Sequence, residues 1–205
     1  LYDITIKPNV LYQNHPALAR DDDGAYRYHQ MQAHDWNGIY SLGDFKYRDT
    51  RELTADDYVY QIKRMASPKL NSPIYQLLSD HVEGFKAYSE KLSQLCSGVC
   101  SADSYLDLNR FPLSGVKVLS RYHFQIKVKG IYRQFIYWLA MPFFAPIPHE
   151  ADRFYSQPGM KKRNISFDWY PIGTGPYLLS VNDPNKEMIL ERNKNFRGEQ
   201  FPQAT

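Results

Sequence analysis

The sequence predicts an α+β fold, in which strands and helices occupy separate stretches of the chain instead of alternating regularly. Three observations carry this prediction. Residues 1–7 alternate apolar and polar side chains as a strand does, residues 54–66 have the cap and the spacing of a helix, and residues 175–193 read as two strands joined by a turn. Segregated strands and helices are typical of α+β domains. We expect a mixed sheet region built from both ends of the chain.

Length and composition limit the classes of function. With 205 residues, the chain can form one ample domain or two small ones. Its 25 basic and 22 acidic residues leave a net charge of only +3, which argues against a nucleic-acid partner. An aromatic content of 15%, with 17 tyrosines, favours a binding cleft. No apolar run is long enough to span a membrane, and because residue 1 already lies in a predicted strand, we do not expect it to be the natural start.

Three helices are predicted in the first half of the chain. Thr54 is a good N-cap, Asp57 stands at the capping-box position, and apolar residues then recur at helical spacing. A short helix should follow, with Ser72 as its cap and Pro73 at its first position. Residues 80–95 have an apolar stripe and should form a third helix in spite of Gly84.

The second half of the chain should contain two hairpins. Residues 115–130 have two alternating runs separated by a polar turn, and residues 175–193 should form two strands joined by an Asp-Pro-Asn turn. Between the hairpins we expect a short helix, an apolar crossing punctuated by prolines, and another helix near Pro148. Residues 156–170 should be a loop.

The stretch "PIGTGPYLLS" resembles a phosphate-binding loop because of Gly173, Thr174 and Gly175. A phosphate loop needs a helix N-terminus after its glycines, whereas a strand follows here. We therefore interpret the three residues as a structural turn in which the glycines allow a positive φ or a close backbone approach. On this interpretation, replacing Gly173 with valine should harm folding.

No pattern predicts a catalytic centre, a metal site or a cofactor. Neither a nucleophile-elbow motif nor the zinc motif HExxH is present. The acidic run at residues 20–24 lacks the register of a calcium loop, and His29 and His34 are not spaced to share a helix face. Cys96 and Cys100 are expected to form a small disulfide loop, with free thiols as the main alternative and metal binding as the weakest one.

Three stretches together resemble the extracellular solute-binding proteins of family 5, the oligopeptide, dipeptide and nickel-type binding proteins of bacterial ABC importers. They are "RELTADDYVYQIKRMASPKLNSPIYQLL", "GVKVLSRYHFQIKVKGIYRQFIYWLAMPFFAPIPHEA" and "PIGTGPYLLSVNDPNKEMILERNKNFRG". Their order and spacing agree with the family, and the resemblance covers essentially residues 1–201. The third stretch is the most specific.

The resemblance implies a periplasmic-binding-protein fold of type II, here as an N-terminal fragment. Residues 1–54 would belong to the first lobe, residues 55–165 to an inserted smaller α+β domain, and residues 166–205 to the return into the first lobe. Members of the family are considerably longer, so the second lobe would lie outside this chain.

The resemblance also implies a function: capture of a small solute, most often a peptide, between two lobes and its delivery to a membrane permease. The protein would be a monomer without a cofactor, exported to the periplasm or the cell surface. In such proteins the segment after the capped helix and the proline-rich crossing approach the cleft. The candidates for ligand contact are therefore Tyr75, Gln76, Met141, Phe143 and Phe144. Core packing is the alternative role for each.

Two other classes of function stay open on the sequence. A hydrolase or carbohydrate-active domain could use the tyrosine-rich segment 25–50, provided that two carboxylates meet in one pocket. A sensor or adhesin could keep the same fold, since a fold does not determine function.

Overall fold

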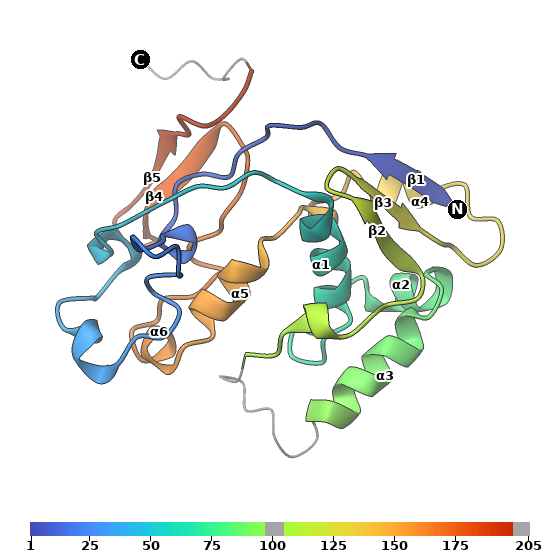
Figure 1. The fold of residues 1–205 in the computed structure, drawn as a ribbon, viewed down its shortest axis with the longest axis horizontal. Coiled ribbons are helices and arrows are strands. Elements are labelled where there is room, and N and C mark those ends of the chain that lie inside the picture. Colours follow the sequence, from blue (N-terminus) through green and yellow to red (C-terminus); the bar gives the residue numbers. More distant parts are fainter. Residues whose placement is uncertain (97–104, 199–205) are drawn as a thin grey trace. The chain divides into compact units, whose positions relative to one another are not determined.

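The computed structural model describes residues 1–96 and 105–198, and Figure 1 traces their helices and strands. The chain forms two units, each with its own hydrophobic core. The first unit consists of residues 1–8 and 54–148. The second unit consists of residues 9–53 and 149–205. The chain therefore passes between the units near residues 9, 54 and 149.

The first unit contains a three-stranded antiparallel sheet with the order β1-β3-β2. Its strands are β1 (Tyr2–Thr5), β2 (Val116–Ser120) and β3 (His123–Ile126). The 115–130 hairpin is confirmed as β2 and β3. On the central strand β3, the fully buried Ile126 pairs with Tyr2 of β1 and with Val116 of β2.

The first strand corrects the expectation of a sheet built from both ends of the chain. The strand is present, but β1 pairs with β3 and not with the C-terminal hairpin. Its inward-facing apolar residues, Tyr2 and Ile4, pack against the core that α1 and the hairpin share. Residues 2–5 pair with residues 123–126, which lie far away in the sequence. The alternation of apolar and polar residues predicts a strand but not its partner.

Helices cover this sheet and complete the core of the first unit. They are α1 (Ala55–Met65), α2 (Tyr75–His81), α3 (Phe85–Cys96) and the short α4 (Phe135–Trp138), with 3₁₀ turns at Leu108–Arg110 and Pro142–Phe144. The capping box of α1 is confirmed: the Thr54 amide donates to Asp57 Oδ2 over 2.9 Å. Helix α1 contacts both β2 and β3.

Two helix starts differ from the sequence prediction. Helix α2 begins at Tyr75 instead of after Ser72, and Ile74 is its N-cap. The predicted helix over 80–95 begins only at Phe85, because Gly84 has a φ of +72°. A residue in that conformation interrupts a helix.

The second unit has little regular structure before residue 149. Three 3₁₀ turns, Pro16–Leu18, Ala33–Trp36 and Leu42–Asp44, are followed by α5 (His149–Tyr155) and α6 (Pro158–Lys162). Helix α6 lies within the predicted loop 156–170 and begins with a proline, which suits a first helical position. The predicted C-terminal hairpin is confirmed as β4 (Tyr177–Asp183) and β5 (Glu187–Arg192).

Aromatic and aliphatic side chains from distant parts of the sequence make the core of the second unit. The buried set is Ala17, Trp36, Leu42, Phe45, Phe154, Met160 and Ile165. Phe154 of α5 contacts Phe45 edge-on, with ring centroids 5.2 Å apart. The irregular segment 9–53 therefore packs against α5 and α6, while antiparallel bridges between Leu11 and Glu52 and between His15 and Asp49 pair its two ends.

Candidate functional site

The five predicted ligand-contact residues all lie in the first unit, but they differ in accessibility. Phe144 is buried and its ring meets Phe135 edge-on, so in this structure it contributes to the core. Phe143 is partly buried against the same core, and its carbonyl accepts a 2.7 Å hydrogen bond from Gln61 Nε2. Met141 is 42% exposed and remains accessible to a ligand.

The two candidates on α2 differ in accessibility as well. Tyr75 is half-buried and packs against Phe85, with ring centroids 5.8 Å apart. Gln76 is exposed, and its side-chain amide donates to Asp80 Oδ1 over 2.8 Å. Contact of these residues with a ligand stays a prediction.

The Gly-Thr-Gly turn lies in the second unit and is held through its backbone. Gln13 donates its backbone amide to the Gly173 carbonyl over 2.9 Å, and the Gly173 amide donates to Gln13 Oε1 over 3.2 Å. The reason we expected for the glycines is wrong, because neither has a φ in the left-handed region and a Cβ would find no atom closer than 4.0 Å at Gly173 and none within 4 Å at Gly175. Substitution of Gly173 by a small residue should therefore be tolerated.

A buried asparagine explains why the turn and the later "LERN" sequence occur together. Asn193 is 2% exposed, its Nδ2 donates to the Gly175 carbonyl over 2.8 Å, and its backbone amide donates to the Pro176 carbonyl over 2.8 Å. Its Oδ1 accepts from the Asn195 amide over 3.0 Å. One side chain thus connects the turn before β4 to the end of β5.

Replacing Asn193 with alanine should lower the free energy of unfolding by about 2 kcal/mol, because the Gly175 carbonyl and the Asn195 amide lose their common partner. Urea unfolding would measure this change. Asn185→Ala is the matched control, since that side chain is exposed in the hairpin turn. Equal stability of the two variants would contradict the role assigned to Asn193.

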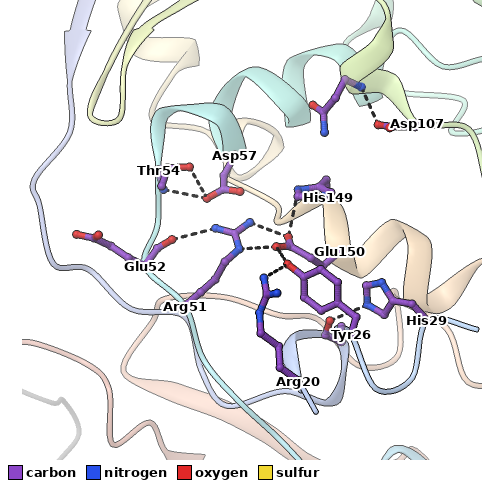
Figure 2. Close-up of polar contacts among 12 residues, drawn as sticks. Arg20, Tyr26, His29, Arg51, Glu52, Thr54, Asp57, Asp107, His149 and Glu150 are labelled. Carbon is purple, nitrogen blue, oxygen red and sulfur yellow. Dashed lines mark hydrogen bonds and ion pairs between the residues drawn. The ribbon is translucent and has the colours of Figure 1, made fainter. Parts of the chain in front are cut away.

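A cluster of charged and aromatic side chains surrounds the buried carboxylate of Glu150 in the second unit (Figure 2). Arg51 donates to both carboxylate oxygens, from Nε to Oε1 over 2.8 Å and from Nη2 to Oε2 over 2.7 Å. The Tyr26 hydroxyl donates to Oε1 over 2.6 Å, and His149 Nδ1 lies 3.3 Å from Oε2. No sequence pattern indicates this cluster, because its members come from three separated segments.

The cluster determines the charge of Glu150. Burial alone would raise the pKa of this carboxyl, but the hydrogen bonds and the positive charge of Arg51, together with His149 and Tyr26, lower it to about 2. A bidentate arginine and a tyrosine hydroxyl leave the carboxylate oxygens well satisfied. We therefore assign the cluster a structural role, the attachment of α5 to the segment 9–53.

Two buried histidines of the second unit are held neutral. His15 Nδ1 accepts from the Ala17 amide over 3.1 Å, so its proton lies on Nε2, which is 2.9 Å from the Tyr155 hydroxyl. Burial, with a contribution from the charge of Arg48, lowers the pKa of His15 to about 3. His29 Nε2 bonds to the Ala17 carbonyl over 2.8 Å, and burial lowers its pKa to about 4.

The protein should lose stability as the pH falls from about 6.5 toward 4. In this range the unfolded chain binds protons on both histidines, while the folded state does not, so acid favours unfolding. Urea midpoints measured at several pH values would show the trend, and replacing His29 with glutamine should make it shallower. Proton NMR that showed His15 titrating near pH 6.5 in the folded protein would contradict this account.

The part of the chain that the structure describes contains neither a metal-binding cluster nor a membrane-spanning helix. Residues 1–96 and 105–198 hold no group of three His, Cys, Asp or Glu side chains that could bind an ion, and no helix there is long and apolar enough to cross a bilayer. Cys96 ends α3, whereas Cys100 lies outside the described residues. The disulfide therefore stays a prediction.

Comparison with known proteins identifies the family. The family model described as "Bacterial extracellular solute-binding proteins, family 5 Middle" matches residues 43–203. The chain therefore belongs to the family 5 extracellular solute-binding proteins. The resemblance noted in the sequence is confirmed.

Individual relatives agree with this family. The nickel-binding periplasmic protein of Escherichia coli is 34% identical over 86 residues, which are 41% of this chain and 15% of that protein. The ABC transporter-associated periplasmic binding protein DppA from Helicobacter pylori, solved with the peptide STSA, matches 97% of this chain and 28% of its own, at a TM-score of 0.54 and 13% identity. An unliganded open form of the murein tripeptide binding protein MppA matches 95% of this chain and 27% of its own, at a TM-score of 0.53 and 17% identity.

The coverages also show how much of each relative this chain matches. The chain spans less than a third of the length of either solved structure and less than a sixth of the nickel-binding protein. At such identities the two structural matches show the fold alone, which confirms the predicted α+β fold of the periplasmic-binding type.

Proposed function

We propose that this chain is part of a solute-binding protein that captures peptides in the periplasm and delivers them to the permease of an ABC importer. Membership of family 5 over residues 43–203 carries this proposal. The solved DppA structure, which matches 97% of the chain, contains a peptide, and this supports peptides as the class of solute. The tyrosine-rich composition suits a cleft that is partly apolar and partly hydrated.

The proposal includes an assignment of the chain to parts of such a protein. Residues 1–54 and 166–205 would belong to the first lobe and residues 55–165 to an inserted domain, with a second lobe supplied by the rest of the natural protein. Two segments depart from this assignment: β1 pairs with β3 of the first unit, and residues 149–165 belong to the second unit. Capture between hinged lobes gives sequence-tolerant affinity, because main-chain hydrogen bonds hold the peptide and roomy pockets accept its side chains. We also propose that the protein acts as a monomer.

Isothermal titration of the full natural protein with two- to five-residue peptides tests this function. We expect saturable heat with at least one peptide length and dissociation constants of about 1 µM, equivalent to about −8 kcal/mol. Nickel(II) is the comparison solute, because one relative is named as nickel-binding. Saturable binding of nickel(II) with no heat from any peptide would mean that the solute is nickel and not a peptide. Hydrolysis of a peptide or glycoside would favour an enzyme instead.

A further inference from the structure

A chemically reactive pair of residues, Asn37 and Gly38, lies at an exposed corner of the second unit. Asn37 is the only asparagine in the sequence that a glycine follows, and both residues are exposed. A Cβ added at Gly38 would meet no atom within 4 Å, and the Gly38 amide has no hydrogen-bond acceptor among the residues that the structure describes. Since glycine has no side chain, little hinders the approach of its amide nitrogen to the side chain of the preceding asparagine.

Asn37 and Gly38 occupy the two central positions of a type II turn. Asn37 has a φ of −67° and a ψ of 126°, and Gly38 has a φ of +78°, as this type of turn requires. The Ile39 amide closes the turn by donating to the Trp36 carbonyl over 3.3 Å. The positive φ explains why a glycine follows Asn37, so the reactive pair is a consequence of the turn.

The closed turn holds the pair in a conformation that does not react. In deamidation the Gly38 nitrogen joins Cγ of Asn37 in a five-membered ring. Closing this ring brings the Gly38 nitrogen to the side of the Asn37 Cβ, which requires a negative ψ at Asn37, whereas the folded value is 126°. The turn must therefore open before the reaction occurs.

One guanidinium holds both ends of this turn. Arg163 Nε donates to the Ile39 carbonyl over 2.6 Å, and Nη2 donates to the Trp36 carbonyl over 2.9 Å. Nη1 donates to the Gly159 carbonyl over 3.2 Å, which attaches the guanidinium to α6. The Trp36 side chain itself is buried in the core of the second unit. Because hydrogen bonds from a charged donor are stronger than neutral ones, their loss makes opening of the turn costly.

We propose that Asn37 is a site of spontaneous deamidation and that Arg163 slows the reaction by keeping the turn closed. In the open turn, the Gly38 nitrogen loses its proton and attacks Cγ of Asn37. The bond between Cγ and the side-chain nitrogen breaks, and ammonia leaves. Water then opens the cyclic imide at either carbonyl, which gives aspartate or isoaspartate. The overall reaction consumes water and releases ammonia, so it needs no oxidant or cofactor, and it does not depend on which solute the protein binds.

The isoaspartate product changes the turn itself. Its main chain runs through the former side chain and is longer by one carbon atom, so the carbonyls of Trp36 and Ile39 no longer match the spacing of the Arg163 donors. Modification at Asn37 is therefore expected to loosen the attachment of the turn to α6.

Peptide mapping by mass spectrometry of the full natural protein, incubated in mildly alkaline buffer, tests this inference. The folded wild type should deamidate at Asn37 at least about tenfold more slowly than the same protein unfolded in urea, where no turn restrains the pair. Arg163→Lys keeps the positive charge but loses the fork that reaches both carbonyls, so the folded variant should react about tenfold faster than the folded wild type.

Lys162→Gln is the matched control, because Lys162 is exposed and precedes Arg163 at the end of α6. It should deamidate at the wild-type rate. Urea unfolding of each variant gives the unfolded fraction, whose contribution is subtracted. An unfolded wild type that keeps Asn37 intact would refute the site, and a folded Arg163→Lys protein that reacts at the wild-type rate would refute the role of Arg163.

Hydrogen exchange of the Ile39 amide in the wild type provides a second measurement, which decides the matter if Arg163→Lys does not fold. This amide closes the turn, so its exchange reports how often the turn opens. The rate of deamidation in the folded protein should equal the unfolded rate multiplied by the open fraction. Faster deamidation than this product would show that the closed turn does not protect Asn37.

Discussion

Replacing Glu150 with glutamine will lower the free energy of unfolding by about 3 kcal/mol, because Arg51 is then left with its charge in a site built around a carboxylate. Glutamine keeps one oxygen for the Tyr26 hydroxyl but presents an NH₂ group where Arg51 needs an acceptor. Since Glu150 is 2% exposed, water cannot replace the lost partner. Urea unfolding followed by tryptophan fluorescence would measure the change.

Glu187→Gln is the control for this substitution. Glu187 lies 3.5 Å from Lys186 in an exposed pair on the hairpin of the same unit. Exposed pairs contribute less than about 1 kcal/mol, so this variant should unfold almost as the wild type does. The structural role of the Glu150 cluster would be refuted if Glu150→Gln were equally stable, and a catalytic or binding role would then need to be considered for it.

Replacing Gly159 with alanine will destabilise the protein by about 2 kcal/mol, although the same change inside a helix normally stabilises it by nearly 1 kcal/mol. Gly159 lies in α6 against the buried indole of Trp36, and an added Cβ would lie 2.1 Å from Trp36 Cε2. The indole cannot move away freely, since the Arg163 guanidinium lies 5.0 Å from the ring and donates to the Trp36 carbonyl over 2.9 Å. The opposite sign of the effect makes this prediction diagnostic.

Gly173→Ala is the matched control for Gly159→Ala. At Gly173 the nearest atom to an added Cβ is 4.0 Å away, so this variant should unfold within about 0.5 kcal/mol of the wild type. Thermal or urea unfolding of both proteins provides the comparison. A stable Gly159→Ala protein would mean that α6 and Trp36 can separate without cost, and that the core of the second unit is looser than its geometry indicates.

Local patterns in the sequence predicted the elements whose causes are local. The capping box of α1 needs only Thr54 and Asp57, three residues apart, and the structure contains it. Both hairpins follow from alternation around a short turn. The prediction failed where one residue's conformation decided the outcome, as at Gly84, whose positive φ separates α2 from α3.

The candidate site was less accessible to prediction. Met141 and Phe144 come from the same apolar crossing, yet one is exposed and the other is buried against Phe135. The spacing of apolar residues does not distinguish these two cases in a segment without regular structure. The Glu150 cluster gave no signal at all, because Tyr26, Arg51 and Glu150 look like ordinary surface residues until the fold brings them together.

The amino-acid sequence alone was sufficient to recognise the family, to limit the function from the composition and to predict the short-range elements. The family motifs and these elements depend on residues close together in the chain. Tertiary structure was needed to learn that β1 joins the hairpin of the first unit, that Asn193 holds the Gly-Thr-Gly turn, and that Tyr26 and Arg51 surround Glu150. These outcomes depend on contacts between distant segments, whose energies come from burial and hydrogen-bond pairing that no local pattern records.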